Sequence, residues 1–343
     1  MTGAGELLIV GVAGPRLAPG ERRILERVRP GGLILFGRNI EDAGQLTELV
    51  SDLRRAAPEA LLYLDAEGGR VDRLRGVVGP APAAAALAAA APAAAQRSGR
   101  WIGRALRRFG FDVDLAPVVD LDYGRPDNSL AGRYLGATPR AVTARARAFL
   151  RGLHGAGVGG CVKHFPGLGA AGEDTHFRGS EVALGWPELE RDLEPFRALM
   201  QIAGAVLISH AIYPAVDPSG RPATLSPAIA TQLLRRRLRF RGVAVSDDLE
   251  MKALGSWGDL PAVSAAALAA GCDLLPVCHS LEAAPAIARR LGSARLAARR
   301  AAAAQRLRRY RRHLARLRSA AGVGDLALIQ AALGRLAREL AAG

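Results

Sequence analysis

The chain is poor in lysine, and arginine carries almost all of its positive charge. Lys163 and Lys252 are the only lysines among 47 basic residues, and the formal net charge is +15. Because the arginines are scattered over many segments, a general preference for arginine explains this charge better than a nucleic-acid surface does. The densest basic run, residues 306–318, has a helical pattern and predicts a solvated face, although an acidic partner for it stays open.

Cysteines are few, and long apolar runs are absent. Cys161, Cys272 and Cys278 are odd in number and form no CxxC motif, which predicts buried free thiols in a reducing compartment. Glu6 precedes the first apolar run without a basic region, so we expect no signal peptide. No stretch reaches the roughly 18 apolar residues of a membrane span. We therefore expect a cytoplasmic protein without a membrane partner.

Aromatic residues make up only 5% of the chain, so a core must consist mainly of alanine, leucine and valine. Near-continuous apolar runs, which predict strands buried on both faces, alternate with helical patterns. The apolar runs are residues 7–14, 31–37, 61–69, 111–121, 159–165, 203–213, 241–249 and 272–278. The clearest helical patterns are residues 40–57, 139–157, 187–204 and 226–240.

This alternation predicts an α/β fold, namely a (β/α)8 TIM-type barrel with extra C-terminal helices. We expect one catalytic domain over residues 1–343, with the barrel at about 5–292 and the helical extension at about 293–343. Polar side chains fall near the ends of several apolar runs, and in such a barrel these ends meet at one face. They are Asp65, Lys163, His164, His210 and Asp247.

Two pairs of polar residues suggest catalysis. Asp247 and Asp248 directly follow an apolar strand, where a carboxylate can act as nucleophile, general base or metal ligand. Strand alternation predicts that one of the two faces the cavity and that the other caps a helix or braces the site. Asp174 and His176 are two residues apart, a spacing that lets a carboxylate orient an imidazole for general acid–base catalysis. A purely structural Asp–His hydrogen bond is the alternative.

A metal site formed by His164, Asp174, His176 and His210 is a further alternative for these polar residues. The chain has no HxH or HExxH spacing, so we expect no metal. The small residues between positions 167 and 172 predict a loop that moves to bring His176 over its substrate.

The segment DAEGGRVDRLR, residues 65–75, combines carboxylates and arginines around a glycine pair. Such groups suit a hydroxyl-rich ligand because they form directional, charge-assisted hydrogen bonds. A surface ion-pair network is the alternative reading. No phosphate-binding glycine loop is present.

Taken together in order, the motifs resemble glycoside hydrolase family 3, specifically the single-domain β-N-acetylglucosaminidases of bacterial peptidoglycan recycling. The resemblance covers nearly the whole chain. It rests on GGLILFGRNI (31–40), DAEGGRV (65–71), KHFPG (163–167), DTH (174–176), SHAIYPAVDP (209–218), PATLSP (222–227), GVAVSDDLEM (242–251) and AGCDLLPVC (270–278).

The resemblance implies a role for each matching residue. Asp247 corresponds to the family's nucleophile, His176 to its acid/base and Asp174 to the partner of that histidine. The implied sugar contacts are Asp65, Arg73, Arg133, Lys163 and His164. Leu168 stands where the family often has a second histidine, but because His176 is present we expect activity.

The implied function is that of a retaining exo-β-N-acetylglucosaminidase acting through a covalent glycosyl-enzyme. Its implied substrates are muropeptide fragments, N-acetylglucosamine β-1,4-linked to anhydro-N-acetylmuramic acid with or without peptide. We expect a monomer without a cofactor and without a nucleic-acid partner. One alternative is a phosphorylase, in which phosphate instead of water takes the sugar from Asp247. A second alternative is an inactive sugar-binding regulatory protein.

Overall fold

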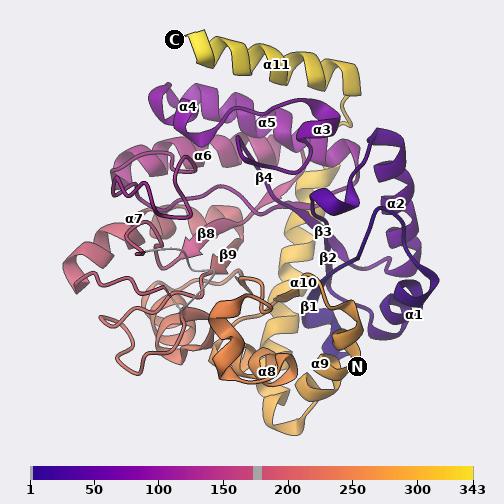
Figure 1. Cartoon of the computed structure of the whole chain (residues 1–343), viewed down its shortest axis with the longest axis vertical. Coiled ribbons are helices and arrows are strands. Elements are labelled where there is room, and N and C mark those ends of the chain that lie inside the picture. Colours follow the sequence, from indigo (N-terminus) through magenta and orange to yellow (C-terminus); the bar gives the residue numbers. More distant parts are fainter. Residues whose placement is uncertain (1–2, 173–179, 343) are drawn as a thin grey trace.

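A computed structural model describes residues 3–172 and 180–342, in which parallel strands alternate with helices that surround them (Figure 1). The parallel strands are β1 (Leu8–Gly11), β2 (Gly32–Ile34), β3 (Leu61–Leu64), β6 (Val113–Asp114), β7 (Gly159–Gly160), β8 (Val162–Phe165), β9 (Ala205–Ile208), β10 (Val243–Ser246) and β11 (Leu275–Val277). An antiparallel hairpin of β4 (Ala66–Gly68) and β5 (Val71–Asp72) follows β3.

Most of the longer helices follow a strand and return the chain to the start of the next one. The α-helices are α1 (Pro19–Val28), α2 (Ala43–Ala56), α3 (Arg75–Val78), α4 (Ala84–Ala89), α5 (Pro92–Arg108), α6 (Pro139–Gly155), α7 (Trp186–Ala203), α8 (Leu260–Ala270), α9 (Ala284–Leu291), α10 (Ala297–Ser319) and α11 (Leu326–Ala342). The 3₁₀ turns are η1 (Ala4–Leu7), η2 (Gly37–Asn39), η3 (Ala223–Leu225), η5 (Lys252–Trp257), η6 (Leu281–Ala283) and η7 (Ala294–Leu296), and η4 (Ala228–Arg237) is a π-helix.

The strands follow one another in a circular order. One sheet has the order β11-β1-β2-β3-β6-β7 and the other the order β10-β9-β8. Since only Cys161 separates β7 from β8, residues 159–165 act as one strand that belongs to both sheets. At the other seam a parallel bridge joins Val245 of β10 to Leu274, just before β11. The α/β fold of TIM-barrel type is therefore confirmed, with a strand in each of the eight predicted apolar runs.

The apolar core has two parts because the strands are buried on both faces. One part lies between the strands and the surrounding helices. The other part fills the inside of the ring and includes Ile9, Tyr63, Val113 and Val245. Along each strand, side chains that face the helices alternate with side chains that face the inside of the ring. Both are apolar, which explains why the apolar runs in the sequence are nearly continuous.

Helix α10 covers the end of the ring at which the strands begin, and it passes behind the strands in Figure 1. Its Leu307, Tyr310 and Leu314 belong to the inner part of the core. A Cβ atom on Gly159, the first residue of β7, would lie 2.3 Å from Leu314 Cδ2, so the helix is packed directly against the strand end. The extra C-terminal helices predicted from residue 293 onward are thus confirmed, and α10 forms the floor of the barrel.

Two buried aspartates bind arginines of α10. Asp273, just before β11, pairs with Arg306 at 3.1 Å and also with Arg235 of η4. Asp112, just before β6, pairs with Arg318 at 2.8 Å. The basic run 306–318 was predicted to be a solvated face, and this is wrong for the side that holds these arginines and the apolar residues of the barrel floor.

Several local predictions can be compared with the structure. The pattern over residues 226–240 forms η4, and at its start Ser226 Oγ accepts a hydrogen bond from Ile229 N at 3.2 Å. The helix is wound as a π-helix, which the apolar pattern did not distinguish from an α-helix. Cys161, Cys272 and Cys278 are buried free thiols, as predicted. Among the described residues, no helix is long and apolar enough to cross a membrane.

Candidate functional site

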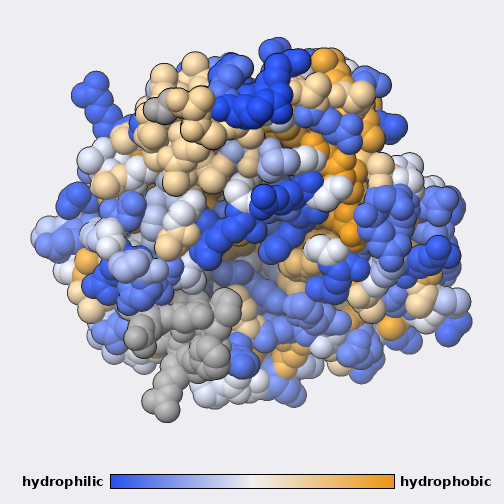
Figure 2. All heavy atoms as spheres, turned by 45° about the horizontal axis from the view of Figure 1, so that its top comes forward, coloured by the Kyte–Doolittle hydropathy of each residue, from blue (hydrophilic) through white to orange (hydrophobic). Residues whose placement is uncertain are grey.

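A cavity of about 540 Å³ opens at the carboxyl ends of the strands. Figure 2 shows a hollow in this face with mostly hydrophilic residues around it. Six residues predicted from the sequence line this single cavity: Asp65, Arg73, Arg133, Lys163, His164 and Asp247. The other two predicted residues, Asp174 and His176, lie outside the described residues.

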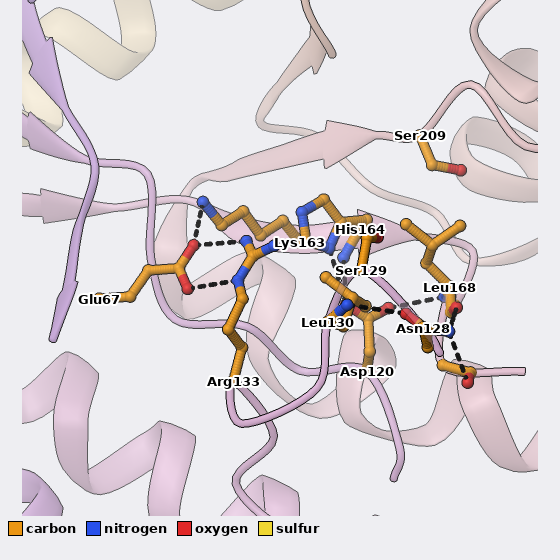
Figure 3. A network of polar contacts seen from close by, with 12 residues as sticks. Glu67, Asp120, Asn128, Ser129, Leu130, Arg133, Lys163, His164, Leu168 and Ser209 are labelled. Carbon is orange, nitrogen blue, oxygen red and sulfur yellow. Dashed lines mark hydrogen bonds and ion pairs between the residues drawn. The ribbon is translucent and has the colours of Figure 1, made fainter. Parts of the chain in front are cut away.

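One wall of the cavity is an ion-pair network around Glu67 (Figure 3). The Lys163 ammonium lies 2.7 Å from Asp65 Oδ1 and 2.6 Å from Glu67 Oε1. Arg133 binds both oxygens of Glu67, at 2.6 and 2.8 Å. The alternative considered for residues 65–75 was a surface ion-pair network, but Glu67 is 7% exposed and this network is buried. Glu67 holds two cations that line the cavity.

Burial and charge act in opposite directions on Glu67. Burial alone raises the pKa of its carboxyl, but the charges of Lys163 and Arg133 lower this pKa to about 2. Burial likewise lowers the pKa of Lys163, and the carboxylates of Asp65 and Glu67 more than reverse this effect and raise it. Both partners are therefore charged at neutral pH, and the wall presents fixed hydrogen-bond donors and acceptors to a ligand.

His164 is oriented by Asp120, which is 1% exposed. The Nδ1 atom of His164 lies 2.8 Å from Asp120 Oδ2, and the same oxygen accepts the backbone N–H of His164 at 3.1 Å. The second oxygen of Asp120 accepts the backbone N–H of Leu168 at 2.7 Å. One carboxylate thus fixes both the imidazole and the segment that follows it (Figure 3).

The segment 163–172 is held down by further contacts. Asn128 Nδ2 donates to the backbone oxygens of Gly169 at 3.1 Å and Ala171 at 3.2 Å, and Tyr213 OH donates to Gly167 O at 3.0 Å. A Cβ atom on Gly169 would lie 1.9 Å from Leu121 O. The small residue at position 169 is therefore explained by close packing. The sequence interpretation of loop movement has no support from Gly167 or Gly169.

Asp247 and Asp248 both line the cavity, contrary to the prediction that only one of them would. Strand β10 ends at Ser246, so the alternation of a strand no longer applies to either aspartate. The backbone N–H of Asp248 donates to Asp247 Oδ1 at 2.9 Å and fixes that carboxylate. Burial, assisted by the charges of Glu250 and Asp247, raises the pKa of Asp248 to about 6.

His210 supports this pair of aspartates from behind. Its Nε2 donates to the backbone oxygen of Asp248 at 2.8 Å, and its Nδ1 lies 2.9 Å from Thr224 Oγ1. Burial lowers the pKa of His210 below its usual value. His210 was predicted to lie at the site with the other polar residues. It lies behind the site as a neutral, buried side chain that holds Asp248 and does not line the cavity.

A metal centre has no candidate within residues 3–172 and 180–342. No group of three or more His, Cys, Asp or Glu residues there could hold an ion. Within the described part of the chain, His164 is engaged with Asp120 and His210 with Thr224 and Asp248.

Sequence reasoning missed Asp120 and Asn128 as residues that shape the site. Asp120 has the same signal as the other site residues, because it falls at the end of an apolar run, 111–121. That run also holds Asp112 and Asp114, so position alone could not choose among them. Asn128 lies in a polar loop, and nothing in the sequence shows its contact with residues 168–171.

Comparison with known proteins gives consistent matches. The model of the glycosyl hydrolase family 3 N-terminal domain matches residues 3–309. A β-hexosaminidase of Methylococcus capsulatus is 40% identical over 282 residues, which cover 80% of this chain and 84% of the relative. A β-hexosaminidase of Pseudomonas aeruginosa is 39% identical over 275 residues, covering 79% and 82%.

Two solved structures are similar over almost the whole chain. NagZ from Neisseria gonorrhoeae, solved in complex with N-trifluoroacetyl-D-glucosamine, has a TM-score of 0.78 and 31% identity, with 98% of each chain covered. A family 3 β-N-acetylglucosaminidase from Paenibacillus has a TM-score of 0.86 and 31% identity, covering 97% of this chain and 67% of that one.

Proposed function

The chain belongs to glycosyl hydrolase family 3, and from this premise we propose that it is a retaining exo-β-N-acetylglucosaminidase that acts on muropeptide fragments. The relatives named β-hexosaminidase support a glycoside hydrolase of the β-N-acetylhexosaminidase type that takes a small sugar substrate. The proposed substrate is N-acetylglucosamine β-1,4-linked to anhydro-N-acetylmuramic acid, with or without a peptide.

The observation that carries the proposal is the arrangement of charges around Asp247. Asp65 and Glu67 are paired with Lys163, whereas Asp247 has no basic ion-pair partner among the described residues. Its carboxylate lines the cavity, with Oδ1 held by the N–H of Asp248. An oriented carboxylate without a neighbouring cation is suited to attack an anomeric carbon.

The proposed reaction has two steps. In the first, an oxygen of Asp247 bonds to the anomeric carbon while the glycosidic bond breaks and His176 gives its proton to the leaving oxygen. In the second, His176 removes a proton from water, the water oxygen bonds to the anomeric carbon, and Asp247 leaves. Two inversions give net retention. Asp174 is proposed to orient His176 and stabilise its charged form.

The other five predicted residues are proposed to bind the hydroxyl groups of the terminal sugar. Asp65, Lys163 and Arg133 offer acceptors and donors whose positions are fixed by the network around Glu67. His164 is fixed by Asp120, and Arg73 lines the same cavity. Preorganised polar groups of this kind favour the transition state because they need not reorganise during the reaction.

The test measures release of p-nitrophenol from the β-N-acetylglucosaminide by the wild type, Asp247→Asn and Asp248→Asn, with and without phosphate. We expect Asp247→Asn to lose at least about 10³-fold in kcat, because it removes the nucleophile, and Asp248→Asn to lose far less. A 5-fluoro-N-acetylglucosaminyl fluoride should lose its anomeric fluoride to attack by Asp247 and add the mass of the 5-fluoro-N-acetylglucosaminyl group to the peptide that contains Asp247.

Three outcomes would contradict the proposal. Full activity of Asp247→Asn would exclude this residue as the nucleophile. Turnover that requires phosphate and yields N-acetylglucosamine 1-phosphate would replace the hydrolase with a phosphorylase. A wild type without activity on this glycoside would overturn the proposed function and favour a sugar-binding protein.

A further inference from the structure

The cavity contains two arginines that no described carboxylate neutralises. Lys163 and Arg133 are paired with Asp65 and Glu67, but neither Arg70 nor Arg73 forms an ion pair within residues 3–172 and 180–342. Arg73 is partly buried, and its Nε has no described hydrogen-bond partner. Arg70 is exposed, which places it at the rim. This wall therefore offers two positive charges to a ligand.

We propose that Arg70 determines specificity by binding a carboxylate on the aglycone, the part of the substrate that leaves. The inference rests on the proposed function and adds to it a specificity-determining residue and a preference for an anionic aglycone. A guanidinium has five N–H donors in a planar fork that matches a carboxylate. One of these donors on Arg70 is engaged by the backbone oxygen of Ser129, and that contact orients the side chain without neutralising it.

The backbone holds Arg70 in place as well. Gly69 and Arg70 form the tip of the β4–β5 hairpin, with Gly68 and Gly69 at φ values of +87° and +61°. Cβ atoms at these glycines would lie 2.2 Å from Pro82 O and 2.8 Å from Ala83 Cβ. The turn is therefore pressed against residues 82–83, and only glycine permits both this approach and this conformation. A side chain on such a turn starts from a fixed position at the cavity mouth.

The charges around the cavity mouth also favour one orientation of the bound aglycone. The hairpin follows β3, whereas Asp247 and Asp248 follow β10, and these two strands lie on opposite sides of the circular order. An anionic aglycone is attracted to the hairpin side and repelled from the aspartate side. The carboxylate would thus turn the leaving group away from Asp247, so that the sugar and not the aglycone faces the nucleophile.

The experiment compares two disaccharides that differ only in charge. N-acetylglucosaminyl-β-1,4-anhydro-N-acetylmuramic acid is assayed with its lactyl carboxylate free and as the methylamide. For the wild type we expect kcat/KM to favour the acid about tenfold, as for a partly exposed charge-assisted hydrogen bond. In Arg70→Gln this ratio should fall to near 1, and Arg70→Lys should restore part of it. Added salt should reduce the wild-type ratio.

Arg75→Gln is the matched control, because Arg75 is an exposed arginine of α3 that does not line the cavity. Its ratio of acid to amide should equal that of the wild type. The inference would be overturned by a wild type with equal kcat/KM for the acid and the methylamide. It would also be overturned by an Arg70→Gln variant whose kcat/KM falls equally for both substrates. Cleavage of the p-nitrophenyl glycoside but of neither disaccharide would overturn it together with the muropeptide substrate. Failure to cleave any of the three would overturn the proposed function itself.

Discussion

Asp192 is a buried carboxylate that the proposed reaction does not use. It lies on α7, is 1% exposed and accepts a hydrogen bond from Tyr123 OH at 2.9 Å. Its second oxygen has no described partner. Burial, with a contribution from the charge of Asp120, raises the pKa of Asp192 to about 7. The folded protein therefore keeps this proton to higher pH than the unfolded chain does.

This shift predicts a pH-dependent stability. A carboxyl with a raised pKa contributes stability that is fully present below its unfolded pKa, near 3.9, and is lost as pH rises through its folded pKa, here about 7. We expect Asp192→Asn, which cannot ionise, to gain on the order of 2 kcal/mol relative to the wild type between pH 5 and pH 8. Urea unfolding at both pH values measures this gain.

Asp42→Asn is the control for Asp192→Asn. Asp42 is an exposed cap of α2, and asparagine caps a helix about as well as aspartate does. Its stability relative to the wild type should be nearly the same at both pH values. If Asp192→Asn behaves in the same way, the carboxyl of Asp192 is not perturbed in the folded protein.

At the scale of single residues, the sequence predicted which side chains gather but not how they pair. Lys163, His164 and Asp247 could be placed on one face because the ends of barrel strands converge there. That Glu67 binds Lys163 and Arg133 depends on the relative positions of β4, β8 and the loop that holds Arg133, and the sequence pattern does not show these positions. Asp120 was not selected for the same reason.

The glycines of the segment 163–172 differ in what surrounds them. Gly169 lies against Leu121 O, and its backbone oxygen accepts a hydrogen bond from Asn128. Around Gly172, no atom of residues 3–172 and 180–342 lies within 4 Å of the position that a Cβ would occupy. Substitutions at these two positions can therefore distinguish the effect of close packing from the effect of backbone flexibility within one segment.

Gly169→Ala should therefore lower both stability and activity. The added methyl group would displace residues 168–171 and weaken their contacts with Asn128, and we expect a loss of about 1–3 kcal/mol in unfolding free energy. Because the same segment contains His164, kcat/KM should fall as well. Thermal unfolding and p-nitrophenyl glycoside hydrolysis measure the two effects.

Gly172→Ala provides the comparison for Gly169→Ala. It should change the stability by less than about 0.5 kcal/mol, as is usual for a substitution without close neighbours. Equal effects of the two substitutions would mean that flexibility of the whole segment, and not the contact with Leu121, is what the glycines provide.

At the scale of elements, the pattern of apolar residues predicted the strands and helices well, because each strand is buried on both faces and most helices have one apolar side. It did not give the β4–β5 hairpin, which lies inside the apolar run 61–69 and the segment that follows it. The hairpin arises from two glycines packed against residues 82–83, a contact between neighbouring loops. The π-helical winding of η4 was likewise invisible to an apolar pattern.

We propose that the whole chain folds as one unit that includes the C-terminal extension. Helix α10 places Leu307, Tyr310 and Leu314 inside the ring. It also brings arginines to Asp112 and Asp273. Helix α11, in contrast, packs on the outside, against α5 and α3, and is seen at the edge of the molecule in Figure 1.

Two truncations test this proposal. A chain of residues 1–292 lacks α10 and should show no cooperative unfolding, because three large core side chains at about 2–5 kcal/mol each approach the whole stability of a domain. A chain of residues 1–321 lacks only α11 and should unfold cooperatively at a lower Tm. Circular dichroism on heating measures both. Cooperative unfolding of the shorter chain would show that the barrel folds without its extension.

The floor made by α10 also has a kinetic consequence. A tunnel would let a glycan thread through and be cut anywhere along its length, but a blind cavity admits only a chain end. In the proposed reaction the aglycone must then depart before water can reach the sugar, and the sugar must leave through the mouth by which it entered. We therefore expect free N-acetylglucosamine to compete with incoming substrate for this one opening and turnover to slow as the product accumulates.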